Sequence, residues 1–420
     1  MNSRERITKA IEHKDTDKLP VDFGGGLTTS IHVNMVYKLR QYYGLDKPGT
    51  PVKIIEPFMC IGEIKDDLRE VFCSDVKMLH GSKAIFFDFP NDDWKEWRMF
   101  DGTPVLVPGL FNTEPNPDGS IFLYPQGDKS TNPSAKMPKN GYYFDAIIRQ
   151  GDVDFDNLNP EDNKEEFGII SDSEIDFLKL QAESIYKKTG YAIYSNAVFS
   201  SFGDIAAVPG MSMKNPKGIR DITDWYIATA KYKEFIKEIF DYQCNLAIEN
   251  YKKIYNAIGN KINITFIMGT DFGTQSGLFM SIESFRELYK PFIKRVNSWV
   301  HENTKWKTLV HSCGSVYDLI PEFIDCGYDI LNPVQVSAAK MQPEKLKAEF
   351  GKYITFWGGA VDTQKILPFG TSEDVKKHTR KNIDIFSKGG GYIFANIHNL
   401  QTNIPIENVA AIIEVIHEYR

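Results

Sequence analysis

Short apolar runs recur along the whole chain, and most are followed by a polar or glycine-containing turn and then by a segment with helical periodicity. Such runs are typical of parallel strands that are buried on both faces. The strand candidates are 19–23, 75–79, 191–195, 263–268, 308–312, 329–333, 353–357 and 391–395. The main helix candidates are 172–188, 221–258, 281–302, 315–325, 343–350, 372–387 and 406–419. This alternation predicts a single α/β domain over 1–420, a (β/α)8 TIM barrel.

One segment, 81–155, breaks the alternation. It contains turn signals such as Asp101-Gly102 and Asp118-Gly119 but no convincing helical pattern. We therefore expect a β-rich insertion after the second strand. Its many aromatic residues could form a small core of their own or roof the mouth of the barrel as a substrate lid, and both alternatives remain open.

Composition narrows the class of protein. A net charge of −7 argues against nucleic acid as a partner. No run of apolar residues is long enough to cross a membrane, and the polar start does not resemble a signal peptide, so we expect a cytoplasmic protein. The five cysteines are odd in number and widely spaced, which predicts reduced thiols. A homodimer is compatible with the aromatic-rich insertion.

Polar residues gather where seven of the expected strands end, and catalytic residues of (β/α)8 barrels lie at these carboxyl ends. The residues are Asp22, Asn196, Asp271, His311 with Cys313, Asn332 with Gln335, Asp362, and Asn396 with His398. We expect Asp271, Asn332 and Asn196 to act in catalysis. We expect Asp22, Phe23, Gln275 and Gln335 to contact the substrate. Any one of these residues could instead cap the following helix.

The most informative pair is His311 and Cys313, at the end of the fifth expected strand. Residues two apart on a strand point the same way, so an imidazole and a thiol would face one site. A catalytic zinc ion usually has three protein ligands and one open position. The third ligand must come from another strand end, where His398 and Asp271 are the candidates and His398 is preferred. The alternative is that His311 caps its strand and Cys313 packs as a small hydrophobic residue.

Several segments together resemble the uroporphyrinogen decarboxylase superfamily, and within it the corrinoid-dependent methyltransferases. They are His-Ser-Cys at 311–313, Asp-Phe-Gly-Thr-Gln at 271–275, Asn-Pro-Val-Gln at 332–335 and Gly-Gly-Ala-Val-Asp-Thr-Gln at 358–364. The resemblance covers nearly the whole chain outside the insertion. It implies a zinc-dependent (β/α)8 barrel that moves a methyl group between a small substrate and a corrinoid (cobalamin) held by a partner protein. In similar proteins the metal motif is completed by a later Cys, and His398 takes that place here.

The resemblance also argues against the reaction that gives the superfamily its name. True uroporphyrinogen decarboxylases carry an arginine-bearing motif near the first strand, which holds the carboxylates of a tetrapyrrole. The matching stretch, 20–29, contains Asp22 and neither Arg nor Lys. Because an aspartate there would repel a polycarboxylate, porphyrinogen decarboxylation is the weaker hypothesis.

The identity of the ligands indicates which methyl transfer is catalysed. Zinc with two thiolates and one imidazole is formally neutral and favours a nucleophilic bound thiolate. Zinc with one thiolate and two imidazoles is formally +1 and is a better Lewis acid. His398 therefore favours an oxygen-bearing methyl donor, such as a methoxylated arene that undergoes O-demethylation. The alternatives are methyl transfer from a methylcorrinoid to a thiol, a metal-free decarboxylase-like lyase, and a non-catalytic binding barrel.

Overall fold

The computed structural model describes residues 1–198 and 200–420. Within these residues, eight parallel strands form one curved sheet in the order β1-β15-β14-β13-β12-β11-β10-β4. They are β1 (Val21–Asp22), β4 (Val76–Leu79), β10 (Ala192–Ser195), β11 (Ile264–Met268), β12 (Lys307–His311), β13 (Ile330–Asn332), β14 (Thr355–Trp357) and β15 (Tyr392–Ala395). Each overlaps a range expected from the sequence, and the predicted (β/α)8 barrel is confirmed.

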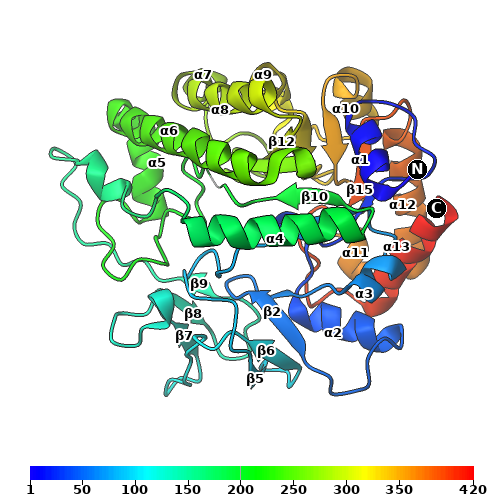
Figure 1. Ribbon diagram of the computed structural model, residues 1–420, viewed down its shortest axis with the longest axis horizontal. Helices are drawn as coiled ribbons and strands as arrows, with labels where there is room; N and C mark the ends of the chain where they lie inside the picture. Colours follow the sequence, from blue (N-terminus) through cyan, green and yellow to red (C-terminus); the bar gives the residue numbers. More distant parts are fainter. Residues whose placement is uncertain (199) are drawn as a thin grey trace.

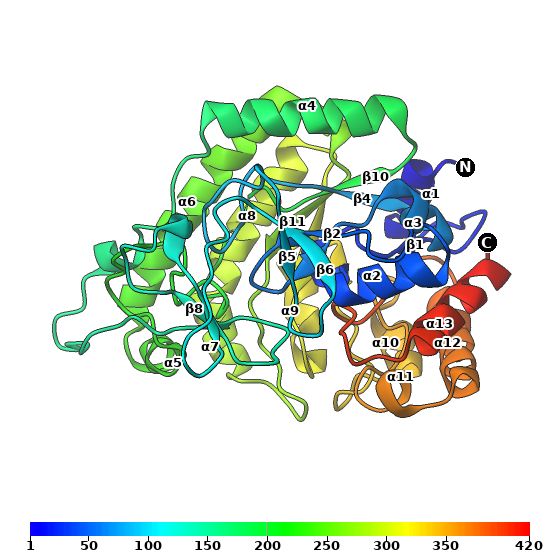
Figure 2. The ribbon, with the colours of Figure 1, turned by 90° about the horizontal axis from the view of Figure 1, so that it is seen from below.

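Helices surround the barrel strands (Figures 1 and 2). They are α1 (Ser3–Ile11), α2 (Val33–Tyr42), α3 (Asp66–Val71), α4 (Asp172–Lys188), α5 (Ile222–Lys231), α6 (Lys233–Ile258), α7 (Ile282–Leu288), α8 (Lys290–Asn303), α9 (Ile320–Asp325), α10 (Pro343–Phe350), α11 (Ile366–Phe369), α12 (Ser372–Phe386) and α13 (Ile406–Glu418). In this part of the chain, none is both long and apolar enough to span a membrane.

Two expected helices are each divided in two. The segment 221–258 breaks at Tyr232, whose backbone leaves the helical region. The segment 281–302 breaks at Tyr289, just before Pro291 in the first turn of α8. Proline lacks an N–H and its ring collides with the preceding turn, so it fits the start of a helix but interrupts its interior.

The predicted β-rich insertion after the second barrel strand is confirmed. It contains β5 (Lys95–Arg98), β6 (Pro104–Val107), β7 (Ile121–Leu123), β8 (Ala135–Met137) and β9 (Asp145–Ala146). These strands gather on one side of the barrel, drawn in cyan in Figure 1. One small sheet also recruits β2 (Val52–Glu56) and β3 (Ile61–Gly62), which precede the second barrel strand and were not expected.

The aromatic residues of the insertion form a core of their own. Phe111 lies between Trp97 and Phe144, with ring centroids 5.2 and 6.0 Å away. Phe87 stacks on Phe89 at 5.7 Å. These packed rings account for part of the aromatic density that the sequence shows in this segment.

The barrel closes between β1 and β4 through Asp75, which has no solvent exposure. The Asp75 N–H donates to the Val21 carbonyl at 2.7 Å, and the Val21 N–H donates to Asp75 Oδ2 at 3.0 Å. Two guanidinium groups, from Arg6 near the start of the chain and Arg420 at its end, also bind the Asp75 carboxylate. One buried carboxylate therefore joins both edges of the sheet and both ends of the chain.

We predict that Asp75→Asn destabilises the protein by about 3–5 kcal/mol, because it leaves two guanidinium groups without their buried counter-charge. Urea unfolding at neutral pH measures the loss. The matched control is Asp17→Asn, which removes a partly exposed partner of the same Arg6 and should cost about 1 kcal/mol or less. Equal losses of stability in the two variants would contradict this account of how the barrel closes.

Candidate functional site

His311 is held in one orientation by a neighbouring strand end. It is the last residue of β12 and pairs in register with Asn332, the last residue of β13. The Asn332 amide donates to the Trp357 carbonyl at 2.9 Å, so its Oδ1 is left as an acceptor for His311 Nδ1–H at 2.6 Å. The proton therefore lies on Nδ1, and the Nε2 lone pair faces Cys313 Sγ at 3.4 Å.

His398, from the loop after β15, completes a group of three candidate ligands. One ligand atom from each of His311, Cys313 and His398 lies within 4.8 Å of the other two, and we call these residues the His-Cys-His group. Asp271, the alternative third ligand, is outside this group. The Asn399 backbone N–H donates to His398 Nδ1 at 2.8 Å. Coordination through either nitrogen of His398 requires that this hydrogen bond be released.

The His-Cys-His group is uncharged at neutral pH. Burial lowers the pKa of both His311 and His398 to about 4. Burial, and then the nearby Asp271 carboxylate, raise the pKa of the Cys313 thiol well above its ordinary value. Both imidazoles are thus neutral, as metal ligands must be, whereas the thiol must lose its proton when a metal binds.

The separation of His311 from Cys313 fits zinc. Zn–S and Zn–N bonds of about 2.3 and 2.0 Å in a tetrahedral site place sulfur and nitrogen about 3.5 Å apart. The separation of Cys313 Sγ from His311 Nε2 is 3.4 Å. Imidazole nitrogen and thiolate sulfur are both ordinary zinc ligands, so these residues could hold the ion.

Two loops cross backbone to backbone immediately after Cys313. A Cβ on Gly314, whose φ is +85°, would lie 2.4 Å from the Gly273 carbonyl oxygen. A Cβ on Gly273 would lie 2.7 Å from the Cys313 carbonyl oxygen. The crossing is fastened by the Cys313 N–H, which donates to Asp271 Oδ1 at 2.7 Å, and by the Gly314 N–H, which donates to Gln335 Oε1 at 2.7 Å. Glycine at both positions therefore sets where the thiol lies.

A cavity of about 290 Å³ adjoins the His-Cys-His group. His311 and His398 line it together with Asn196, Asp204 and Asp271. The remaining wall is largely apolar and includes Leu27, Met59, Ile85, Phe86, Ile205 and Phe266. Because Ile85 and Phe86 come from the insertion, that segment supplies part of the cavity wall as well as its own core.

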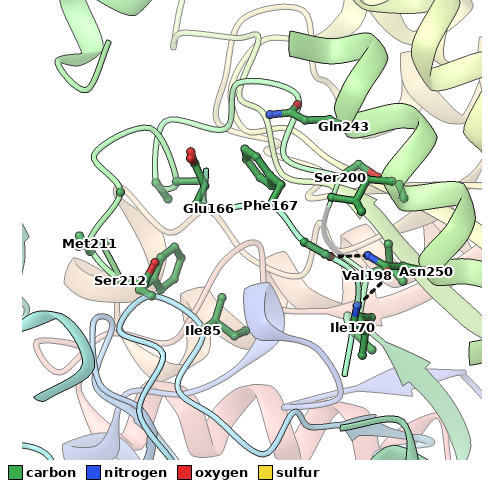
Figure 3. Close-up of a pocket in the computed structure, with 18 residues that line it drawn as sticks. Ile85, Glu166, Phe167, Ile170, Val198, Ser200, Met211, Ser212, Gln243 and Asn250 are labelled. Carbon is green, nitrogen blue, oxygen red and sulfur yellow. Dashed lines mark hydrogen bonds between the residues drawn. The ribbon is translucent and has the colours of Figure 1, made fainter. Parts of the chain in front are cut away.

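A second pocket of about 260 Å³ shares Ile85, Phe86 and Ala206 with this cavity (Figure 3). Its main polar side chains are engaged within the fold. The Asn250 amide donates to the Gly168 carbonyl, and Gln243 Oε1 accepts the Phe202 N–H at 3.0 Å. The pocket also contains Glu166, whose carboxylate is paired with the Arg220 guanidinium at 2.7 Å.

The other candidates from the sequence are placed differently. Asn332 lies behind His311 and orients it. Gln335 supports the Gly314 turn, and Gln275 is exposed. Asp22 and Phe23 are fully buried. Substrate contacts of Asp22, Phe23, Gln275 and Gln335 stay predictions, since none of the four is among the described residues that line the cavity.

Asp22 is enclosed by donors from its own barrel. Its carboxylate accepts hydrogen bonds from the Gly25 N–H, the Thr29 hydroxyl and Trp357 Nε1–H. Burial nevertheless raises its pKa to about 6. These contacts tie the first strand end to the rest of the barrel.

Asp204 is the cavity residue that sequence reasoning missed. It lies in the loop between β10 and α5, within Ser-Phe-Gly-Asp-Ile-Ala-Ala at 201–207. Burial raises its pKa to about 7, with a further contribution from Asp271. An acidic residue inside an apolar, glycine-containing segment after a barrel strand was the available signal.

Comparison with known proteins places the chain in a family. Residues 211–419 match the family model described as uroporphyrinogen decarboxylase (URO-D). The chain belongs to the uroporphyrinogen decarboxylase superfamily. This confirms the superfamily expected from the motifs, and the matched region contains the whole His-Cys-His group. A search of curated proteins returned no match.

Two solved structures show how this member of the superfamily compares in fold. One is a methyltransferase from Methanosarcina mazei, 14% identical, with a TM-score of 0.56 and coverage of 100% of this chain and 99% of that chain. The other is a B12-independent methionine synthase from Shewanella sp. W3-18-1, 12% identical, with a TM-score of 0.41 and coverage of 96% and 98%. The first likeness supports the barrel fold over its full length.

We predict that Gly314→Ala destabilises the protein by at least about 2 kcal/mol, because the new Cβ meets the Gly273 backbone and φ is positive. Urea unfolding measures the change. Gly277→Ala, in the neighbouring loop, is the control: its Cβ would meet nothing within 4 Å, so a change within about 0.5 kcal/mol is expected. Wild-type stability of Gly314→Ala would show that the loops do not cross as described.

Proposed function

We propose that this protein is a zinc-dependent methyltransferase that moves a methyl group from an oxygen-bearing donor, a methoxylated aromatic compound, to the cobalt of a corrinoid protein. The observation that carries the proposal is the His-Cys-His group at the wall of an apolar cavity. The likeness to a methyltransferase from Methanosarcina mazei supports the same reaction class.

The proposed zinc ligands are His311 Nε2, Cys313 Sγ and a ring nitrogen of His398. With one thiolate and two imidazoles, the ion would supply Lewis acidity toward the donor oxygen. Asn332 would keep His311 in the correct tautomer and orientation, as hydrogen-bonded neighbours do for metal-ligating histidines. Asp271 would hold the Cys313 backbone through its N–H.

The cavity favours a small aromatic donor over a tetrapyrrole. Its volume of about 290 Å³ is just below the range for small-molecule pockets, ~300–1,000 Å³. Leu27, Met59 and Phe86 provide apolar surface for a flat ring. Among the described residues, the cavity lining contains Asp204 and Asp271 and no Arg or Lys, so it offers no positive charge to a polycarboxylate such as a porphyrinogen.

Breaking the methyl–oxygen bond leaves negative charge on the oxygen, and stabilising this charge is the step that the site must assist. The burial of the candidate ligands helps, because electrostatic interactions are stronger where water is excluded. The Asn196 side chain lines the same cavity and could donate a hydrogen bond to the substrate. Its predicted role in catalysis is thus compatible with its position.

We predict that the reduced, purified protein binds one zinc ion per chain and that Cys313→Ala and His311→Ala abolish this binding. Metal analysis after dialysis, with a chromophoric chelator as competitor, measures it. The control is Cys73→Ala, since Cys73 also contacts a histidine, His417 at 3.7 Å, but outside any three-ligand group of the described chain. Unchanged zinc content in Cys313→Ala would remove the metalloenzyme proposal.

We predict that the zinc-loaded protein, mixed with cobalt(I) corrinoid protein and a panel of methyl donors, forms methylcobalt from methoxyarenes, as followed by cobalt absorption. His398→Cys should retain zinc but demethylate more slowly, because a second thiolate lowers the formal charge of the site from +1 to neutral. Formation of methylcobalt from none of the methoxyarenes would contradict the proposal. Methylation of a thiol by methylcorrinoid would instead support the alternative direction of transfer.

A further inference from the structure

Asp204 has one carboxylate oxygen open to the cavity. Its Oδ1 accepts the Ala206 N–H at 2.9 Å, and its backbone carbonyl accepts the N–H of Ala207. No hydrogen-bond donor or cation of the described chain contacts Oδ2. With 8% of its surface exposed, Asp204 lines the cavity beside His311 and His398.

A neighbouring strand end leaves space for this oxygen. Gly269 directly follows β11, and a Cβ there would lie 2.7 Å from Asp204 Oδ2. Any other residue at position 269 would therefore push the carboxyl group away. Gly269 lines the same cavity, so the open oxygen lies at the carboxyl ends of the strands, where the His-Cys-His group also lies.

The surroundings of Asp204 favour its protonated form, so that a substantial fraction carries a proton near neutral pH. Burial raises its pKa to about 7, and the Asp271 carboxylate adds to the effect. The titratable groups around it are Asp271 after β11, the His-Cys-His group and Tyr226 of α5. The two imidazoles are neutral, so none of these groups supplies a positive charge that would favour the ionised carboxylate.

Other buried acids lack this open geometry. Both oxygens of Glu56 accept backbone N–H groups, from Phe58 and Met59. Asp22 accepts three donors from its own barrel. In the cavity itself, the Asp271 carboxylate accepts the Cys313 N–H through Oδ1 and also interacts with the Cys313 thiol. Asp204 is the cavity carboxyl group that combines a buried position with an unengaged oxygen among the described residues.

We propose that Asp204 is the proton donor to the leaving oxygen of the methyl donor, an inference that rests on the proposed function. The electron pair of cobalt(I) forms the new bond to the methyl carbon as the carbon–oxygen bond breaks. The electron pair of the broken bond stays on the oxygen, which takes the proton of the Asp204 carboxyl group and leaves as a phenol. Asp204 is left as a carboxylate and regains its proton from solvent when the phenol departs.

Asp204→Asn is the informative variant. Asparagine has nearly the same size and can keep the bond to the Ala206 N–H, so the loop should fold normally, but it carries no transferable proton. Methyl transfer should be measured with a series of aryl methyl ethers whose phenols differ in acidity. We expect a loss of roughly 10²–10⁴-fold with the least acidic phenols and a much smaller loss with nitro-substituted ones. Asp204→Glu should recover part of the rate.

The pH profile and infrared spectrum provide readouts that a structural role would not change. The wild-type rate should fall as the pH rises through about 7, because the acid form of Asp204 is lost, and this limb should be absent in Asp204→Asn. The metal-free protein should show an infrared carbonyl band of a buried carboxylic acid that titrates in this range. The band should disappear in Asp204→Asn and persist in Glu56→Gln.

The outcomes separate the two proposals. If wild-type protein forms methylcobalt while Asp204→Asn loses the same factor with every donor, or loses nothing, the proton-donor role is wrong and the proposed function stands. An infrared spectrum without a protonated Asp204 at pH 6 also overturns the role. If wild-type protein forms methylcobalt from no methoxyarene, the proposed function and the role of Asp204 fall together.

Discussion

Closure of the barrel is the constraint on which the site depends, because its candidate ligands come from strands that are not neighbours. β12 carries His311 and β15 precedes His398, with β13 and β14 between them. Only a sheet curled into a barrel brings these two rings to a centroid separation of 5.4 Å. The closing contact, Asp75 with Arg6 and Arg420, lies just before the start of β4, and the two chain ends meet there (Figure 1). The contacts that close the barrel thus lie near the amino end of β4, whereas the candidate site lies at the carboxyl ends of the strands.

The electrostatics of the carboxyl-end cavity favour a dication. Two neutral imidazoles, a protonated thiol and two acids share a largely apolar space. Burial, and then the Asp271 carboxylate, make ionisation of Cys313 unfavourable without a counter-charge, which is why the pKa of the thiol is raised. A bound zinc ion would reverse this preference, since it stabilises a thiolate directly. The same ion would polarise a donor oxygen, so one positive charge would both stabilise the thiolate and activate the substrate.

Strands and helices with a regular hydrophobic pattern could be predicted from the sequence. Contacts that depend on the path of irregular loops could not. Fully buried strands such as Ile264–Met268 are continuous apolar runs, and residues at i and i+2 on a strand must share a face, so the barrel and the His311–Cys313 pair were predictable. The position of Asp204 depends on an irregular segment after β10, which has no periodicity to interpret. Likewise, the sequence places Asn332 at a strand end, but only the register of β13 against β12 reveals that it bonds to His311.

His398 links metal binding to the loops at the mouth of the barrel. In the structure its Nδ1 accepts the Asn399 N–H, and metal coordination through either ring nitrogen removes that acceptor. The Asn399 side chain accepts the Ser30 N–H from the loop after β1 and donates to the sulfur of Met59, which lines the cavity. A shift of Asn399 on metal binding would therefore also displace its two partners, Ser30 and Met59. A Cys at position 398 would have no ring nitrogen to accept this N–H. Compared with such a Cys, His398 differs in the charge it would give the site and in this hydrogen bond to the neighbouring backbone. His at this position would thus affect both the Lewis acidity of a bound ion and the shape of the cavity beside it.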